Sequence, residues 1–203
     1  MNPEGMSRTD ITREAWLERA VTLLQPLYAD TPAKPCSVRV SVGWPIVGGR
    51  PGKKQRVGEC WVQGAEDKKP AIFISPVCAD AFTALETLAH ELIHAYLPPK
   101  TGHRGAFKVT ALAVGFMPPM RSTPCSPELA TKLHAIAKKL GAYPHAKINP
   151  GMRKKQPTRM IKCSCPACGY ICRTVKKWLE EQGAPICPCN RKVMSADFEA
   201  DEE

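Results

Sequence analysis

Hydrophobic residues recur at helical spacing in four stretches of the chain, and each stretch predicts an amphipathic helix. These stretches cover approximately residues 11–29, 81–97, 106–116 and 127–140. Thr9 and Asp10 can cap the first of these helices, and the prolines of residues 30–35 end it. Two prolines after Leu97 end the second helix, because proline cannot continue it.

Three shorter segments between the first two helices have the patterns of strands. Residues 37–42 alternate cleanly between hydrophobic and polar side chains, and residues 56–63 alternate less well. Residues 71–75 form a short hydrophobic run that is typical of a buried strand. These patterns together predict an α+β fold, with helices and a small three-stranded sheet.

The second helix carries histidines at the spacing of a metal site. His90 and His94 are four residues apart and therefore project from one face of the helix. With Glu91 they form the H-E-x-x-H pattern of zinc hydrolases, in which the glutamate is the general base. His103 follows the helix at a distance from which it can return as a third ligand, leaving one position open for water, as in a catalytic zinc site. The alternative is an amphipathic helix with ordinary histidines.

Glu86 lies one turn before His90 on the same side of the predicted helix. A carboxylate in that place can hold the free ring nitrogen of a zinc-bound histidine. The alternative, which is the more common outcome for such a residue, is a solvated carboxylate.

Six of the ten cysteines crowd the last fifth of the chain. Cys165 and Cys168 form a zinc knuckle, and Cys187 and Cys189 supply a second pair about twenty residues later. Four thiolates predict a closed, structural zinc site that contributes folding free energy to a small β ribbon. The spacing of the second pair is unusual, so Cys163 is an alternative ligand. Residues 173–178 alternate as a ribbon strand would.

Positive charge is concentrated around this module. The chain has a formal net charge of +10, and residues 147–177 contain nine lysines or arginines and no acidic residue. This density, with Tyr170 and Trp178 available for stacking, predicts non-specific binding of single-stranded or duplex DNA. The candidate contacts are Arg153, Lys154, Lys155, Arg159, Lys162, Arg173, Lys176 and Lys177. The alternative is a ribbon that only braces the first domain.

Composition shifts divide the chain of 203 residues into four parts. We expect a main domain over residues 1–146, a basic linker over 147–159, the ribbon over 160–195 and an acidic, disordered tail over 196–203. No hydrophobic run approaches the roughly 18 residues that cross a bilayer. The first residues also lack a secretory pattern, so we expect a protein without membrane contact that stays in the cytoplasm, or in the nucleus if the host cell has one.

Several motifs of the first domain resemble those of the SprT-like metallopeptidases, the group that includes the DNA-dependent protease Spartan. They are Ser-Val-Gly-Trp-Pro at 41–45, Gly-Glu-Cys-Trp at 58–61, Ile-Phe-Ile-Ser-Pro at 72–76, the helix 87–95, Gly102-His103 and Phe107. Within that group the chain is most similar to phage and bacterial members, which would place it in the cytoplasm of a bacterial host cell if it is phage-encoded. A zinc ribbon often follows in such proteins.

The resemblance implies a zincin-like core and a zinc-dependent endopeptidase. His90, His94 and His103 would bind a catalytic zinc ion, Glu91 would act as the base, and the substrates would be proteins associated with DNA. The alternative is a non-catalytic nucleic-acid-binding or scaffold protein with an inactive core. A metal-dependent nuclease is disfavoured, because it would not need Glu91 in this role.

Overall fold

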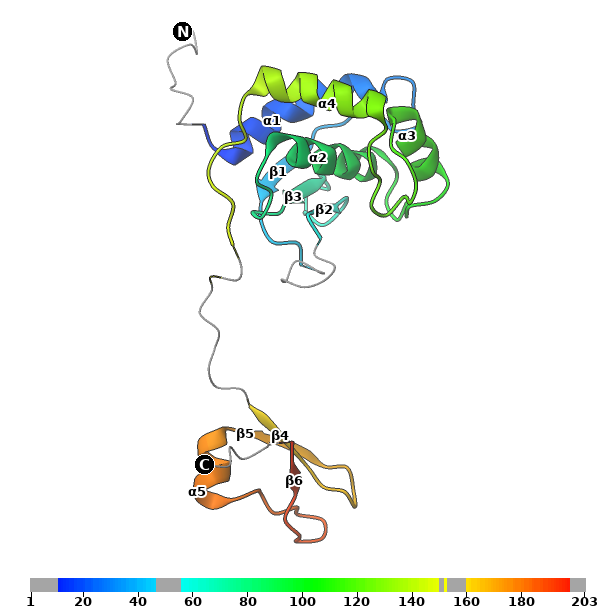
Figure 1. The fold of residues 1–203 in the computed structure, drawn as a ribbon. Coiled ribbons are helices and arrows are strands. Elements are labelled where there is room, and N and C mark those ends of the chain that lie inside the picture. Colours follow the sequence, from blue (N-terminus) through cyan, green and yellow to red (C-terminus); the bar gives the residue numbers. More distant parts are fainter. Residues whose placement is uncertain (1–10, 47–55, 150–151, 153–159, 198–203) are drawn as a thin grey trace. The chain divides into compact units, whose positions relative to one another are not determined.

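The computed structural model describes residues 11–46, 56–149, 152 and 160–197. The chain forms two compact units, Met1–Gly151 and Met152–Glu203 (Figure 1). The predicted linker at 147–159 lies mostly outside the described residues, so the predicted domain boundaries stay predictions.

The first unit contains the four predicted helices and the three predicted strands, which confirms the α+β fold. In chain order its elements are α1 (Arg13–Leu24), the 3-10 helix η1 (Gln25–Tyr28), β1 (Arg39–Val42), β2 (Gly58–Trp61), β3 (Ala71–Ile74), α2 (Ala81–Tyr96), α3 (Ala106–Val114) and α4 (Pro127–Leu140). The predicted cap at Thr9 and Asp10 lies outside the described residues. The cap of α1 is Thr12, whose side chain accepts a hydrogen bond from the backbone N–H of Ala15 over 3.1 Å.

The three strands form a mixed sheet in the order β1–β3–β2. β1 is parallel to β3, whereas β2 is antiparallel to it and forms an edge of the sheet. Helices α1, α2 and α4 lie on one face of this sheet (Figure 1). Side chains of the sheet and of α1, α2, α3 and α4 share one hydrophobic core between these layers.

Helix α2 is the most deeply buried helix of the unit. It begins after Asp80, whose carboxylate accepts a hydrogen bond from the backbone N–H of Thr83 over 2.8 Å. Leu85, Leu88 and Leu92 are fully buried along one side of the helix. Each buried leucine stabilises the fold by about 1.5–3 kcal/mol. Packing and the cap therefore hold the helix in place, and its histidines lie at the border of the core.

Arg13 ties the beginning of this unit to its last segment. Its side chain is buried and donates hydrogen bonds to four backbone carbonyl oxygens, those of Pro76, Cys78, Pro144 and His145, over 2.8–3.3 Å. The guanidinium group also lies 4.7 Å from the centre of the Tyr143 ring. Within the described part of the chain, carbonyl dipoles and the ring are thus the partners that stabilise this charge.

The second unit contains β4 (Ile161–Ser164), β5 (Ile171–Thr174), α5 (Lys176–Gln182) and β6 (Ser195–Ala196). Its strands form an antiparallel sheet in the order β5–β4–β6. The prediction of a strand over 173–178 is wrong in its second half, because β5 ends at Thr174 and a helix begins at Lys176. Ala196, which was predicted to begin the tail, pairs with Cys163 in the sheet, and residues 198–203 lie outside the described part.

None of the helices in the described part of the chain is both long and apolar enough to cross a membrane.

Candidate metal centres and the cleft of the first unit

Three imidazole rings meet beside helix α2. His90 and His94 come from the helix itself, and His103 comes from the loop between α2 and α3. The Nε2 atom of His103 lies 3.2 Å from Nε2 of His94 and 3.3 Å from Nε2 of His90. Nitrogen ligands of a tetrahedral zinc ion, at about 2.0–2.1 Å from the metal, are about 3.3 Å apart. The spacing of the three nitrogen atoms therefore fits one metal ion.

The electrostatic surroundings keep these histidines neutral. Burial and the two neighbouring imidazoles lower the pKa of His90 to about 3, and burial and His103 lower the pKa of His94 to about 4. Burial, together with the positive charges of Arg121 and Arg56, also lowers the pKa of His103. A metal needs unprotonated nitrogen ligands, so this cluster offers them at neutral pH.

Phe107 on α3 packs against all three rings. Its ring centre lies 4.5 Å from that of His94, 4.8 Å from that of His103 and 5.1 Å from that of His90. The side chain is fully buried. Helix α3 thus supplies a rigid hydrophobic wall that limits how far the imidazoles can turn.

The second ring nitrogen of His90 has a partner that the sequence did not indicate. Its Nδ1 atom lies 2.6 Å from Oγ1 of Thr123, in the loop between α3 and α4. The suggestion that Glu86 holds a histidine is wrong, because Glu86 accepts a hydrogen bond from the backbone N–H of Cys125 over 3.2 Å. Glu86 therefore holds the loop, and the loop in turn holds the histidine through Thr123.

Glu91 is buried where α2 and β2 come closest. A Cβ atom placed on Gly58 of β2 would lie 2.8 Å from Oε1 of Glu91 and 2.5 Å from Cγ2 of Thr87. Only glycine at position 58 allows this approach of strand and helix. Burial, together with the negative charge of Glu59, raises the pKa of Glu91 to about 8, while Arg56 opposes the shift. A bound cation would favour the ionised carboxylate.

Glu91 and the three histidines line one cleft of about 1010 Å³. Strand β2 with the residues before it and the loop segment Arg121–Thr123 also line this cleft. Arg56 lies 4.0 Å from Glu59, and the backbone N–H of Ile46 donates a hydrogen bond to the same carboxylate over 2.8 Å. The cleft thus combines a possible metal site, a buried carboxyl group and an edge strand.

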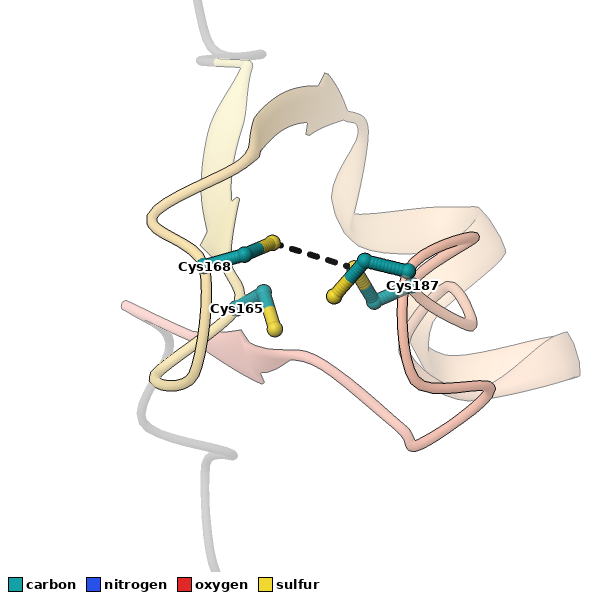
Figure 2. A group of neighbouring side chains, drawn as sticks. Cys165, Cys168 and Cys187 are labelled. Atoms are coloured by element: carbon teal, nitrogen blue, oxygen red, sulfur yellow. Dashed lines mark hydrogen bonds between the residues drawn. The ribbon is translucent and has the colours of Figure 1, made fainter.

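The second unit brings together the four cysteines that the spacing predicted. The sulfur atoms of Cys165, Cys168, Cys187 and Cys189 all lie within 4.8 Å of one another. Figure 2 shows three of these side chains, Cys165, Cys168 and Cys187, directed toward one another. Cys168 is 3.6 Å from Cys187, and Cys187 is 3.4 Å from Cys189. Sulfur ligands at about 2.3 Å from a tetrahedral zinc ion are about 3.8 Å apart. The cluster could therefore hold a metal ion.

The alternative ligand Cys163 lies outside this cluster. It is a fully buried residue of β4 and pairs with Cys172 of β5. The thiol of Cys165 receives hydrogen bonds from the backbone N–H groups of Cys168 and Ala167, which lower its pKa to about 6. The side-chain amide of Asn190 donates another over 3.6 Å. These donors favour the thiolate that a metal requires.

The candidate nucleic-acid contacts are only partly within the described residues. Arg153, Lys154, Lys155 and Arg159 lie outside them. Lys162 of β4 and Arg173 of β5 are cross-strand neighbours, and Lys162 lies 4.0 Å from Asp197. Lys176 and Lys177 begin α5 and lie 3.5 Å and 3.8 Å from Glu180 and Glu181. Tyr170 and Trp178 are each 50% exposed, and the Lys177 ammonium group lies 5.0 Å from the centre of the Trp178 ring.

Sequence reasoning found the residues of both clusters and named Phe107 among its motifs, but it missed Thr123, the hydrogen-bond partner of His90. Thr123 is 33 residues from His90, and nothing in the local pattern of its loop marks it. Comparisons of the chain with protein-family models, with curated proteins and with solved structures give no match. The assignment of a function therefore rests on the geometry of the sites.

Proposed function

We propose that the first unit is a zinc-dependent endopeptidase of the SprT-like kind that its sequence motifs resemble. The observation that carries the proposal is the convergence of three neutral imidazole nitrogens, at zinc-ligand spacing, beside the buried carboxyl group of Glu91. When bound, zinc supplies Lewis-acid activation of a water molecule and of the scissile carbonyl group.

The residues of the chain have separate roles in this mechanism. His90, His94 and His103 would hold the metal, which would supply the chemistry of a catalytic zinc site. Glu91 accepts a proton from the attacking water and returns it to the leaving amine. Packing of α2 and Phe107 keeps the ligands in place, so little reorganisation is needed when the substrate arrives.

Strand β2 supports a peptide as the substrate. It lines the cleft, and among the described residues no strand pairs with its second edge. An extended peptide can add to such an edge through backbone hydrogen bonds, which hold the chain without demanding one sequence. This arrangement would bring a scissile bond toward the histidines.

We further propose that the second unit recruits the enzyme to DNA. Lys162 and Arg173 place two cationic side chains side by side on the ribbon, and Tyr170 and Trp178 are exposed enough to stack on bases. The net charge of +10 supports a polyanionic partner. The substrates would then be proteins bound to DNA.

The decisive experiment compares wild type with Glu91→Gln in the full chain. Zinc is measured in both, and cleavage of an unfolded protein is followed with and without DNA. We expect unchanged zinc content and a loss of cleavage of about 10²–10⁴-fold, because the general base is removed. Glu18→Gln, on the exposed side of α1, is the matched control and should cleave normally. Glu91→Gln that keeps its zinc and cleaves like wild type would refute the mechanism.

The DNA proposal has its own test. The double variant Lys162→Ala with Arg173→Ala should weaken DNA binding. It should also make the slope of log K against log salt less steep, by the amount expected for the loss of about two phosphate contacts. Lys132→Ala with Lys138→Ala on α4 is a control of equal charge in the other unit. An unchanged salt slope in the ribbon variant would place the contacts elsewhere. DNA binding without any proteolysis by wild type would favour the scaffold alternative.

A further inference from the structure

His90 and His94 differ in the groups that surround their rings. A backbone group of Thr101 acts on His94 and raises its pKa, and no substitution of a side chain removes that group. His90 instead meets a side-chain hydroxyl group, that of Thr123, with its Nδ1 atom 2.6 Å from Oγ1. Thr123 is only 2% exposed. The hydrogen bond at Nδ1 of His90 therefore depends on one buried side chain, in addition to the packing of Phe107 against the ring.

The direction of this hydrogen bond follows from the rest of the cluster. Nε2 of His90 lies 3.3 Å from Nε2 of His103 and faces the possible metal position, so it must carry a lone pair there. The proton of the neutral imidazole is then on Nδ1, and Nδ1–H donates to Oγ1 of Thr123. A partner on the far nitrogen fixes both the tautomer and the angle of a ligating ring.

The loop that carries Thr123 is fastened to α2 at two points. Cys125 donates its backbone N–H to Glu86 over 3.2 Å, and Thr123 contacts His90. Glu86 and His90 are four residues apart and therefore lie on one face of the helix. Within the loop, Phe116 and Cys125 form a β-bridge, and the backbone N–H of Thr123 donates to Pro119 O over 2.8 Å. The loop is thus braced on both sides of Thr123.

The backbone of Thr123 adds an independent observation. Its φ angle is +31°, in a region that β-branched residues rarely adopt. Strain of this kind, on the order of 1–3 kcal/mol, persists where the surroundings impose it and is often found at functional sites. Glycine or asparagine would accept the conformation more readily, but neither offers a hydroxyl group at this place.

We propose that Thr123 is a positioning residue that holds His90 in its Nδ1–H tautomer with Nε2 directed at the metal. The inference rests on the metal site of the proposed function, but not on peptidase activity. Glu86 acts with it by holding the loop in register on α2.

The test compares Thr123→Val, which keeps the shape and removes the hydroxyl group, with Thr123→Ser, which keeps the hydroxyl group. Affinity of the histidine site is measured in the full chain with cobalt, because imidazole and thiolate sites give different absorption spectra. We expect Thr123→Val to weaken binding at the histidine site by about 10–100-fold, with the cysteine site unchanged. Thr123→Ser should stay within about threefold of wild type. Equal affinity of wild type and Thr123→Val, or equal losses in both variants, would overturn the proposal.

A second measurement covers the case in which Thr123→Val fails to fold. Nitrogen-15 NMR of the metal-free wild type should show His90 with a protonated Nδ1 and a bare Nε2, and the opposite tautomer would overturn the proposal. The peptidase proposal fails separately. A wild type that binds metal with the expected dependence on Thr123, but cleaves no protein, would refute peptidase activity and leave the role of Thr123 intact.

Discussion

The histidine and cysteine clusters hold their ligands in place by opposite means. His90 and His94 are carried by a helix of 16 residues whose leucines are buried in a core that contains no ligand. In the second unit the cluster is part of the core, because Cys165 and Cys187 are two of the five buried residues among those described there. A fold that does not need its metal can leave a coordination position open for chemistry. A fold that does need it has to close the site.

Breaking the cysteine cluster should have the largest effect. We expect Cys187→Ser, or removal of zinc by a chelator, to unfold the second unit, because binding free energies of about 10–16 kcal/mol are typical of structural zinc in small modules. Amide hydrogen exchange of β4 and β5 in the full chain is the measurement. The signals of the first unit are the internal control. Persistent protection of β4 without metal would show that this unit has a sufficient core of its own.

In the first unit we expect stability to depend on the hydrophobic core and not on the histidine cluster. Leu92→Ala, on the buried side of α2, should lower the free energy of unfolding of that unit by about 2–5 kcal/mol and leave its ligands in place. His103→Ala should abolish metal binding there and change the unfolding free energy of the metal-free protein by less than about 1 kcal/mol. Denaturant titration of the metal-free chain measures the free energy of unfolding of each variant. A large loss of stability in His103→Ala would remove the distinction between the two units.

A substitution that disturbs the close contact between β2 and α2 should have a smaller effect on stability and should also reduce cleavage. Gly58→Ala places a Cβ atom within 3.0 Å of Thr87 and Glu91, so strand or carboxylate must move. We expect about 1–3 kcal/mol of destabilisation and a fall in cleavage rate, because Glu91 is displaced. Gly102→Ala is the matched control, since a Cβ atom there meets nothing within 4 Å. Equal cleavage by both variants would contradict this account.

The smallest effect is expected on the surface of the ribbon. Lys177 and Glu181 form an exposed pair one turn apart on α5, at 3.8 Å. Glu181→Gln should lower the stability of the second unit by about 0.3–0.5 kcal/mol, and added salt should erase the difference. Thermal unfolding at two salt concentrations measures this. A loss as large as that of Cys187→Ser would mean that α5, and not the cysteine cluster, holds the unit together.

Local sequence patterns predicted the helices whose ends are marked by capping residues, prolines and glycines. Helix α4 has the predicted bounds because Ser126 caps it, Pro127 begins it and Gly141 follows its last residue. Helix α5 was missed because Arg173–Trp178 alternates like a strand, although the Lys–Glu pairs and Gly183 were helix signals in the sequence.

At the candidate sites, too, local patterns predicted residues that are close in the sequence but not partners that are distant in it. Spacing selected the three histidines and favoured the four cysteines, with Cys163 left as an alternative. Helix geometry places His90 and His94 on one face, and knuckle geometry does the same for Cys165 and Cys168. The partner of His90 could not be found this way. Glu86 has the right local spacing, but a backbone N–H from 39 residues further along the chain occupies it, and Thr123 takes the place that was expected for it.

The four hydrogen bonds of the Arg13 side chain limit how far the protein can be shortened from its C-terminal side. A chain cut before Tyr143 would remove two of the four carbonyl acceptors and the aromatic ring, and a full positive charge would remain buried in the first unit. Such a fragment would retain all three histidines of the cluster and yet fold poorly, so an isolated first unit has to extend past His145.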